Sequence, residues 1–244
     1  MGNKNRIVIV GATSGIGYEV AKLFCQQGWR VAIAGRRADR LEAFRKEICA
    51  QVVTETIDVT QPDAPERLQR LISKLGGMDL FLLSSGIGSQ NRQLEASIEL
   101  ATVETNVKGF TQMVDYAWSY FKEQGGGHIA VISSIAGTKG LGAAPSYSAS
   151  KRFQNTYIES LSQLARMQKL SITFTDIRPG FVKTDLLKND HYPLLMQPDK
   201  VARQIVSALM KRKRCVIIDW RYRLLVFFWR LLPSALWERL PIHN

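Results

Sequence analysis

The sequence has few of the residues that bind metals or form disulfides. Its 244 residues include three cysteines and three histidines. Cys25, Cys49 and Cys215 lie far apart and match no metal-ligand spacing, and the histidines are scattered as well. We therefore expect no metal site, and we expect free thiols in a reducing cytosol.

Long hydrophobic runs are also lacking. The first apolar run, residues 7–10, is too short for the core of a secretory signal. The run in the C-terminal tail, residues 224–229, is followed by Arg230, whereas a spanning helix needs about twenty apolar residues. A cytoplasmic location is expected, with no segment that crosses a bilayer.

Acidic residues are scarce beside basic ones: 21 against 33, for a net charge of +12. Such a balance favours phosphates, anionic membrane surfaces or nucleic acid as partners. A nucleic-acid-binding protein would need a basic face with interleaved aromatic residues. Much of the excess instead lies at residues 211–214 and in the tail, so we expect no nucleic-acid partner.

Apolar segments with strand and helix patterns alternate along the chain. The expected strands are residues 7–10, 30–34, 52–57, 80–83, 128–132, 172–177 and 216–218. The expected helices include residues 41–48, 100–121, 147–167 and 201–210, with further helical stretches around residues 20–24 and 68–72. This alternation predicts a single α/β domain of the Rossmann type, a doubly wound parallel sheet of about seven strands with helices on both faces. It would span residues 1–219, and residues 220–244 would form an aromatic and basic tail.

A glycine-rich turn joins the first expected strand to the first helix. The turn carries the pattern GxxxGxG at residues 11–17. Glycines allow a tight turn and a close approach of a pyrophosphate, and the helix N-terminus supplies free N–H groups. We therefore predict a dinucleotide site. Its expected contacts are Gly11, Thr13, Ser14, Gly15, Ile16 and Gly17.

The end of the second expected strand distinguishes between the two nicotinamide cofactors. An NAD site usually places an acidic residue there to hold the ribose 2′-hydroxyl. This chain has Arg36 and Arg37 instead, and guanidinium groups fork onto phosphate. The pattern favours NADP(H), with a solvated arginine pair as the alternative.

Tyr147 and Lys151 are spaced i, i+4 on an expected helix, so both can reach one point. A lysine charge about 5 Å away would lower the phenol pKa by about two pH units, which suits proton exchange with a carbonyl or alcohol. Ser134 follows the fifth expected strand, at the sheet edge where ligands bind in doubly wound folds. A serine there can hydrogen-bond a substrate oxygen.

Taken together, the motifs resemble those of the short-chain dehydrogenase/reductase family. The similarity covers residues 6–184 and, more loosely, the chain to residue 218. The motifs occur in the family's order: Gly11, Gly15 and Gly17; Asp58 and Val59; Asn106; Ser133 and Ser134; Tyr147 and Lys151; Pro179, Gly180 and Thr184.

The resemblance implies a role for each matching position. Asn106, Ser134, Tyr147 and Lys151 would be the catalytic residues: Asn106 would hold a water that relays protons to Lys151, Ser134 would orient the substrate oxygen, and Tyr147 would exchange the proton. Lys151 would also bind the nicotinamide ribose. The other implied cofactor contacts are Asp58 and Val59 at the adenine and Pro179, Gly180, Val182 and Thr184 at the nicotinamide.

Two positions depart from the family pattern. Val10 stands where the family often has threonine, and residues 83–86 replace the family's Asn-Asn-Ala-Gly with Leu-Ser-Ser-Gly. Ser85 and Gly86 are still expected at the cofactor, and Ser84 would replace the lost amides in part. The departures concern cofactor packing and leave the four catalytic positions intact.

The sequence thus predicts an NADPH-dependent enzyme that interconverts a carbonyl and a secondary alcohol, with Tyr147 as general acid/base. The alternative is a catalytically silent NADP-binding regulatory protein of the same fold. The resemblance implies a homodimer or homotetramer. Residues 186–197 are expected to form an apolar flap, which favours an apolar small-molecule substrate.

Two interpretations of residues 220–240 remain open. In one, this aromatic and arginine-rich segment covers the substrate cleft or a neighbouring subunit. In the other, it lies in a membrane interface as a peripheral contact, with its aromatics at the headgroups and its arginines on anionic lipid.

Overall fold

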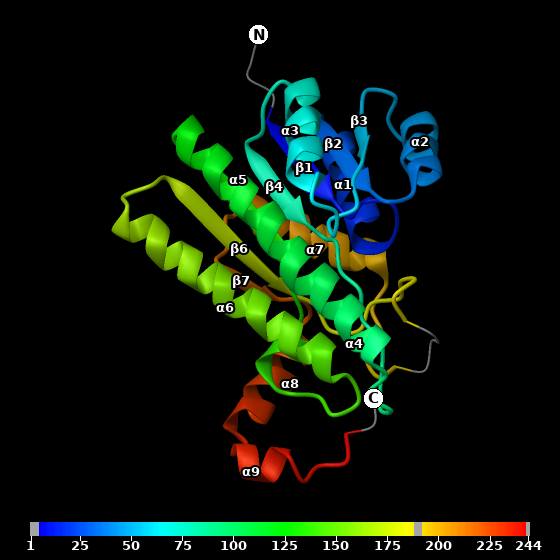
Figure 1. Ribbon diagram of the computed structural model, residues 1–244, viewed down its shortest axis with the longest axis vertical. Helices are drawn as coiled ribbons and strands as arrows, with labels where there is room; N and C mark the ends of the chain where they lie inside the picture. The colour runs from blue at the N-terminus through cyan, green and yellow to red at the C-terminus, as the bar shows by residue number, and fades with distance from the viewer. Residues whose placement is uncertain (1–4, 188–191, 243–244) are drawn as a thin grey trace.

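A seven-stranded parallel sheet lies between two layers of helices in the computed structural model, which describes residues 5–187 and 192–242 (Figure 1). The strands are β1 (Arg6–Val10), β2 (Arg30–Gly35), β3 (Val53–Thr56), β4 (Leu80–Leu83), β5 (Gly127–Ile132), β6 (Ile172–Arg178) and β7 (Cys215–Ile217). Their order in the sheet is β3-β2-β1-β4-β5-β6-β7. The predicted fold class is confirmed, and each predicted strand is present.

The central strands β1, β4 and β5 are mostly apolar because both faces of the sheet are covered there. Along β1, Ile7 and Ile9 face one layer, while Val8 and Val10 face the other. The first layer holds α1 (Gly15–Gln26), α2 (Ala38–Glu47) and α7 (Pro198–Met210). The second layer holds α3 (Ala64–Leu75), α5 (Phe110–Gln124) and α6 (Pro145–Met167).

The strand order reverses at β1, which pairs with β2 on one side and β4 on the other. Val10 is in register with Ala34 of β2 and with Leu83 of β4, so these strands end at one level. The loop after β1 leads to α1 in the first layer, whereas the chain after β4 leads to α5 in the second layer. Such a switch point opens a crevice at the carboxyl ends of the strands.

One predicted helix, residues 100–121, is divided into three segments. It consists of α4 (Ala96–Val103), a π-helical segment η1 (Glu104–Gly109) and α5. The side chain of Asn106 bonds both main-chain groups of Ile87: its Oδ1 accepts from the amide at 2.9 Å, and its Nδ2 donates to the carbonyl at 2.7 Å. The wider π turn occurs where this side chain reaches into the neighbouring loop, and such turns frequently mark functional sites.

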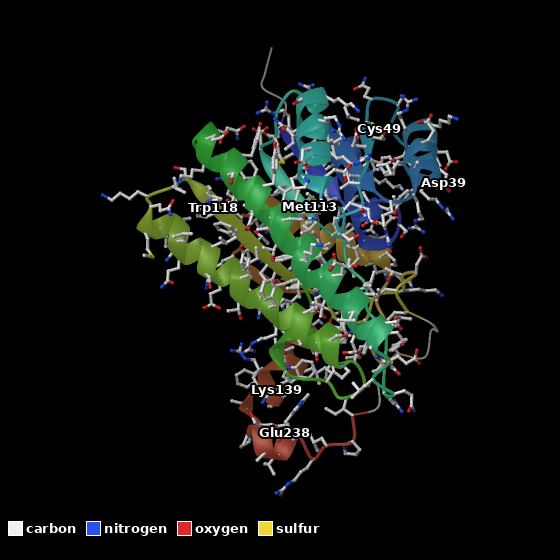
Figure 2. The ribbon with its side chains drawn as sticks, viewed as in Figure 1. Asp39, Cys49, Met113, Trp118, Lys139 and Glu238 are labelled. Atoms are coloured by element: carbon white, nitrogen blue, oxygen red, sulfur yellow. The ribbon has the colours of Figure 1, made fainter. Side chains whose placement is uncertain are left out.

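The tail forms two helices, α8 (Trp220–Leu231) and α9 (Ser234–Trp237), at one end of the molecule (Figure 1). Helix α8 ends before Pro233, a residue that disfavours continuation of a helix. The loop after the 3-10 turn η2 (Ile135–Thr138) ties the tail down: Lys139 Nζ donates to the Leu232 carbonyl at 2.8 Å (Figure 2). The Trp237 indole donates to the Gly140 carbonyl at 2.7 Å.

No helix within the described part of the chain is long and apolar enough to cross a membrane. The described residues also contain no cluster of three or more side chains that could hold a metal ion.

Candidate active site

A cavity of about 1990 Å³ lies at the carboxyl ends of the central strands and extends toward the tail. Nearly every residue predicted for the site lines it. The lining residues among them are Gly11, Thr13, Ser14, Gly15, Ile16, Arg36, Arg37, Asp58, Val59, Ser85, Gly86, Ser134, Tyr147, Lys151, Pro179, Gly180, Val182 and Thr184. Gly17 and Asn106 do not line the cavity.

The glycine-rich turn takes a conformation that side chains disfavour. Gly11 and Gly15 have φ of +94° and +58°. A Cβ on Gly11 would lie 2.7 Å from the main-chain carbonyl carbon of Ser84, so no residue with a side chain fits at this position. Ser14, at the N-cap of α1, makes no side-chain capping bond. The first amides of α1 are therefore available to an anion at the cavity wall.

Arg37 reaches across the turn. Its guanidinium donates to the Ser14 hydroxyl at 2.6 Å and to Thr13 Oγ1 at 3.1 Å, and it forms an ion pair with Asp185 at 3.3 Å. Arg36 is exposed beside it on the cavity wall. The two arginines thus stand at the outer end of the glycine-rich turn, as the sequence analysis expects.

Asp58 and Val59 form the next part of the wall, after β3. Asp58 Oδ1 accepts from the amide and hydroxyl of Thr60 at 3.0 and 2.8 Å. One carboxylate oxygen is thereby used to hold the loop. Val59 is buried and packs against Gly109 at the end of η1.

Tyr147 lies in the first turn of α6 with its ring facing the cavity. Pro145 begins the helix, and the carboxylate of Glu99 from α4 accepts from the Ser146 amide at 3.0 Å. The Tyr147 ring packs flat against Gly88, where any Cβ would collide with it. Lys151 Nζ lies 5.8 Å from the centre of the Tyr147 ring, so the two predicted partners do share one face of α6.

The expected direction of the Tyr147 pKa is wrong for the protein without cofactor. Burial raises the pKa of Tyr147, and a hydrogen bond with Ser134 lowers it only in part. The Lys151 ammonium group makes its hydrogen bonds to the Ile132 carbonyl and to Gln154, and none to the Tyr147 hydroxyl.

Lys151 is buried, and its Nζ donates to the Ile132 carbonyl at 3.1 Å and to Gln154 Oε1 at 3.0 Å. Burial lowers the pKa of Lys151 to about 8, against the opposing attraction of Asp176. The lysine thus titrates near neutral pH, which suits a group that takes part in proton exchange.

Gln154 is a residue that the sequence analysis missed. It is 1% exposed, and its Nε2 donates to the main-chain carbonyl of Asn106 at 2.9 Å. The resemblance implies a water between Asn106 and Lys151, and here the Gln154 amide bridges these two groups directly. Its i, i+3 spacing from Lys151 was the available signal. A glutamine on a helix is usually solvated, so this signal is weak.

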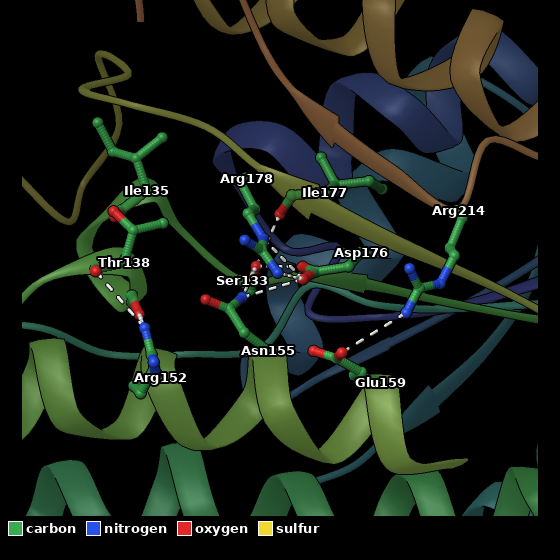
Figure 3. A network of polar contacts seen from close by, with 11 residues as sticks. Ser133, Ile135, Thr138, Arg152, Asn155, Glu159, Asp176, Ile177, Arg178 and Arg214 are labelled. Atoms are coloured by element: carbon green, nitrogen blue, oxygen red, sulfur yellow. Dashed lines mark hydrogen bonds and ion pairs between the residues drawn. The ribbon is translucent and has the colours of Figure 1, made fainter. Parts of the chain in front are cut away.

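Ser134 and Ser133 have different tasks. The Ser134 hydroxyl accepts from the Ala136 amide at 3.0 Å and faces the cavity beside Tyr147. Ser133 points the other way, into a buried network with Asn155 and Asp176 (Figure 3). Asn155 Nδ2 bonds Asp176 at 3.0 Å, and Arg178 Nε bonds the same carboxylate at 2.7 Å. This network fastens α6 to β6.

The tail takes part in the site, which the sequence left open. The Tyr222 ring packs on Gly180, where a Cβ would collide with it, and its hydroxyl accepts from the Phe181 amide at 3.0 Å. The same hydroxyl donates to the Pro193 carbonyl at 3.0 Å. Helix α8 thereby holds the segment after β6. The tail residues that line the cavity are Tyr222, Leu225, Phe228, Trp229, Leu231, Leu232, Trp237 and Ile242.

The predicted flap is described only in part. Leu186, Leu187, Tyr192 and Leu194 line the cavity, whereas residues 188–191 lie outside the described residues. The boundary placed at residue 219 stays a prediction.

The cavity fits a dinucleotide cofactor in two respects. Gly11 and Gly15 shape the turn on the cavity wall with positive φ, and the N-terminus of α1 at this turn has no side-chain cap. Tyr147 and Ser134 line the same cavity beyond the turn. A nicotinamide cofactor lying along this wall would pass from the paired arginines to the tyrosine.

Known proteins are similar to this chain in sequence. The short chain dehydrogenase family model matches residues 5–192. An uncharacterized oxidoreductase of Myxococcus xanthus is 31% identical over 95% of this chain and 94% of its own length. Dehydrogenase/reductase SDR family member 7B of Bos taurus is 28% identical over 96% of this chain and 79% of its own length.

Solved structures show the same fold. A 3-ketoacyl-(acyl-carrier-protein) reductase of Brucella melitensis, complexed with NADH, has a TM-score of 0.79 and 24% identity, covering 88% of this chain and 96% of its own. A single-residue variant of actinorhodin polyketide ketoreductase with NADPH has a TM-score of 0.77 and 24% identity, and the match covers 88% of this chain and 95% of the ketoreductase chain. Given the match of the family model over most of its length, the chain belongs to the short chain dehydrogenase family of oxidoreductases.

Proposed function

We propose that the protein is an NADPH-dependent oxidoreductase that interconverts a carbonyl and a secondary alcohol, with Tyr147 as the general acid/base. The observation that carries the proposal is the meeting of Tyr147, Ser134 and Lys151 in one cavity with the glycine-rich turn. Two similar folds solved with NADPH or NADH support a nicotinamide cofactor.

The basic residues at the outer end of the cavity favour NADPH over NADH. Arg36 and Arg37 follow β2, and the described chain places no acidic side chain at the start of α2 to meet a ribose 2′-hydroxyl, since Asp39 does not line the cavity. When bound, the nicotinamide supplies or accepts the hydride. Pro179, Gly180, Val182 and Thr184 would hold its ring, and Lys151 its ribose.

The chain's own groups handle the proton. Ser134 would hold the substrate oxygen, and the Tyr147 hydroxyl would donate its proton to that oxygen in reduction or take it in oxidation. Lys151 would restore the proton state of Tyr147, with Gln154 linking it to the Asn106 carbonyl. Burial raises the pKa of Tyr147, so the phenol is protonated at neutral pH and can act as the proton donor.

The substrate end of the cavity is apolar. Beyond Tyr147 the wall consists of aliphatic and aromatic side chains from the flap and the tail, among them Leu187, Tyr192, Leu225 and Phe228. We therefore propose a hydrophobic carbonyl compound as substrate, with a cytoplasmic location for the enzyme.

The test is oxidation of NADPH, followed by absorbance, with a panel of ketones of graded chain length. Tyr147→Phe should lower kcat by roughly 10²- to 10⁴-fold and leave NADPH binding, measured by fluorescence, unchanged. Tyr18→Phe is a matched control, because Tyr18 lies on α1 and does not line the cavity. Near-normal turnover by Tyr147→Phe would refute the mechanism.

A further inference from the structure

Helix α8 has two apolar sides, and only one of them is used for packing. Tyr222 and Val226 are buried in the core of the domain, and Trp229 packs against it. The opposite side is an exposed stripe whose five side chains are 49% to 66% accessible. The stripe consists of Trp220, Leu224, Phe227, Phe228 and Leu231.

The stripe is continuous along the helix. Its members are spaced i, i+4, i+7, i+8 and i+11, which places them on one face about 100° wide. An apolar face of this kind normally turns inward in a globular protein. Here the side chains of the face are exposed, and the helix lies at the end of the molecule that also carries α9 (Figure 1). A contiguous exposed patch of this type marks an interaction surface.

Arginines border the stripe on both sides. By the rotation of the helix, Arg223 and Arg230 lie along one edge and Arg221 lies along the other. Arg221 is held by Asp219 at 2.8 Å. Among the residues that the structure describes, no acidic side chain forms an ion pair with Arg223 or Arg230. Their positive charge is therefore free to meet an anionic partner.

The cavity reaches the stripe. Phe228 and Leu231 belong to the exposed face and also line the cavity that contains Tyr147. Leu225 and Trp229 of the same helix line this cavity as well. The outer surface of α8 and the predicted reaction centre therefore adjoin one cavity.

We propose that the α8 stripe docks on an anionic lipid bilayer and that the substrate is a lipid carbonyl compound entering the cavity from that bilayer. Aromatic side chains with bordering arginines suit the headgroup region of such a membrane. The net charge of +12 adds a longer-range attraction. The lipid substrate rests on the function proposed above, whereas the docking does not.

The charges around the α8 stripe indicate whether its partner is a bilayer or a second copy of the chain. A two-fold contact through the stripe would bring Arg223 and Arg230 of one copy near those of the other, with like charges opposed. An anionic bilayer instead places opposite charge against these residues and covers the apolar side chains between them. The observations therefore favour the bilayer.

Flotation of the full chain tests the docking, using phosphatidylcholine vesicles with and without phosphatidylserine. The unaltered chain should float with the anionic vesicles at low salt. Leu224→Gln/Phe227→Gln should bind about tenfold or more weakly, since it removes two apolar groups from the interface. Met167→Gln should float like the unaltered chain, because Met167 is an exposed apolar residue at the end of α6 remote from α8 (Figure 1).

Two outcomes would overturn the docking: the unaltered chain fails to float with anionic vesicles, or the double variant floats as well as the unaltered chain. If, in the second case, the double variant also converts a dimer to a monomer in light scattering, the stripe is a contact between copies.

A turnover measurement tests delivery of the lipid. A long-chain ketone embedded in anionic vesicles should be reduced several-fold more slowly by the double variant, and a short water-soluble ketone at the same rate. Leu224 and Phe227 do not line the cavity, so the second rate controls for damage to the site. If the double variant and the unaltered chain reduce the embedded ketone at the same rate, the proposed delivery is overturned. If the unaltered chain turns over neither ketone, the proposed function is refuted, and flotation still tests the docking.

Discussion

Gln154 Oε1 accepts a hydrogen bond from Lys151 Nζ at 3.0 Å inside the core of the domain. The other end of the same amide donates to the Asn106 carbonyl at 2.9 Å. A side chain of this protein thus spans the gap between the π-helical segment and the lysine. Because the amide cannot exchange with solvent as a water does, it fixes the position of the ammonium group.

We predict that Gln154→Leu lowers kcat roughly tenfold or more while the protein stays folded. The change removes an acceptor that favours charged Lys151, so the pKa of this lysine, about 8 in the intact protein, should fall. The alkaline limb of the pH–rate profile should move to lower pH. A lower rate with an unmoved limb would make Gln154 a packing residue only, and Gln168→Leu, beyond the end of α6, serves as the control.

NADPH should bind more tightly than NADH, and Arg36→Ala/Arg37→Ala should reduce the difference by roughly ten- to a hundredfold. The reason is the loss of two guanidinium groups beside the glycine-rich turn. Binding is measured by titration of nucleotide fluorescence. Arg40→Ala removes the same charge from α2 outside the cavity and should leave the preference intact. Equal affinities in the unaltered protein would show that the arginines are merely solvated.

The free energy of unfolding should fall by about 2 kcal/mol between pH 7 and pH 5 through His128 alone. Burial lowers the pKa of His128 from 6.5 to about 4, so the unfolded chain binds the proton more readily in this window. The free energy of unfolding therefore decreases as the pH falls below 6.5, the pKa of His128 in the unfolded chain. Urea unfolding at both pH values measures the change.

His128→Gln supplies the comparison for this effect. The His128 ring bonds Thr175 Oγ1 at 2.8 Å, and a glutamine amide offers a donor in its place without a charge change. The variant should lose much of the pH dependence between 7 and 5. An unchanged dependence would assign the effect to other groups.

We predict a dimer or a tetramer, so light scattering at micromolar concentration should give a mass two or four times the 27.5 kDa of one chain. Tyr157 on α6 contacts Asp115 on α5 at 2.5 Å, and the stacked rings of Phe153 and Tyr157 are only partly covered. Phe153→Gln should weaken association through these helices, and Met210→Gln on α7 should not. A monomeric mass for the unaltered chain would contradict the prediction.

The fold was predictable because its signals are local and repeated. The central strands β1, β4 and β5 appear in the sequence as short apolar runs, and parallel strands joined by helices admit few topologies. The division of residues 96–124 was missed because a π turn depends on where the Asn106 side chain finds its partners. Those partners, both on Ile87, are nineteen residues away.

The sequence by itself determined the parts of the site that depend on neighbouring residues. Glycines at positions 11, 15 and 17 set the turn, and the i, i+4 spacing of Tyr147 and Lys151 sets a shared helix face. Only the tertiary structure decided that Gln154 faces inward to Lys151 and that Trp220, Phe227 and Leu231 face outward. Composition does not distinguish two apolar sides of one helix, because burial depends on which side meets residues distant in the chain.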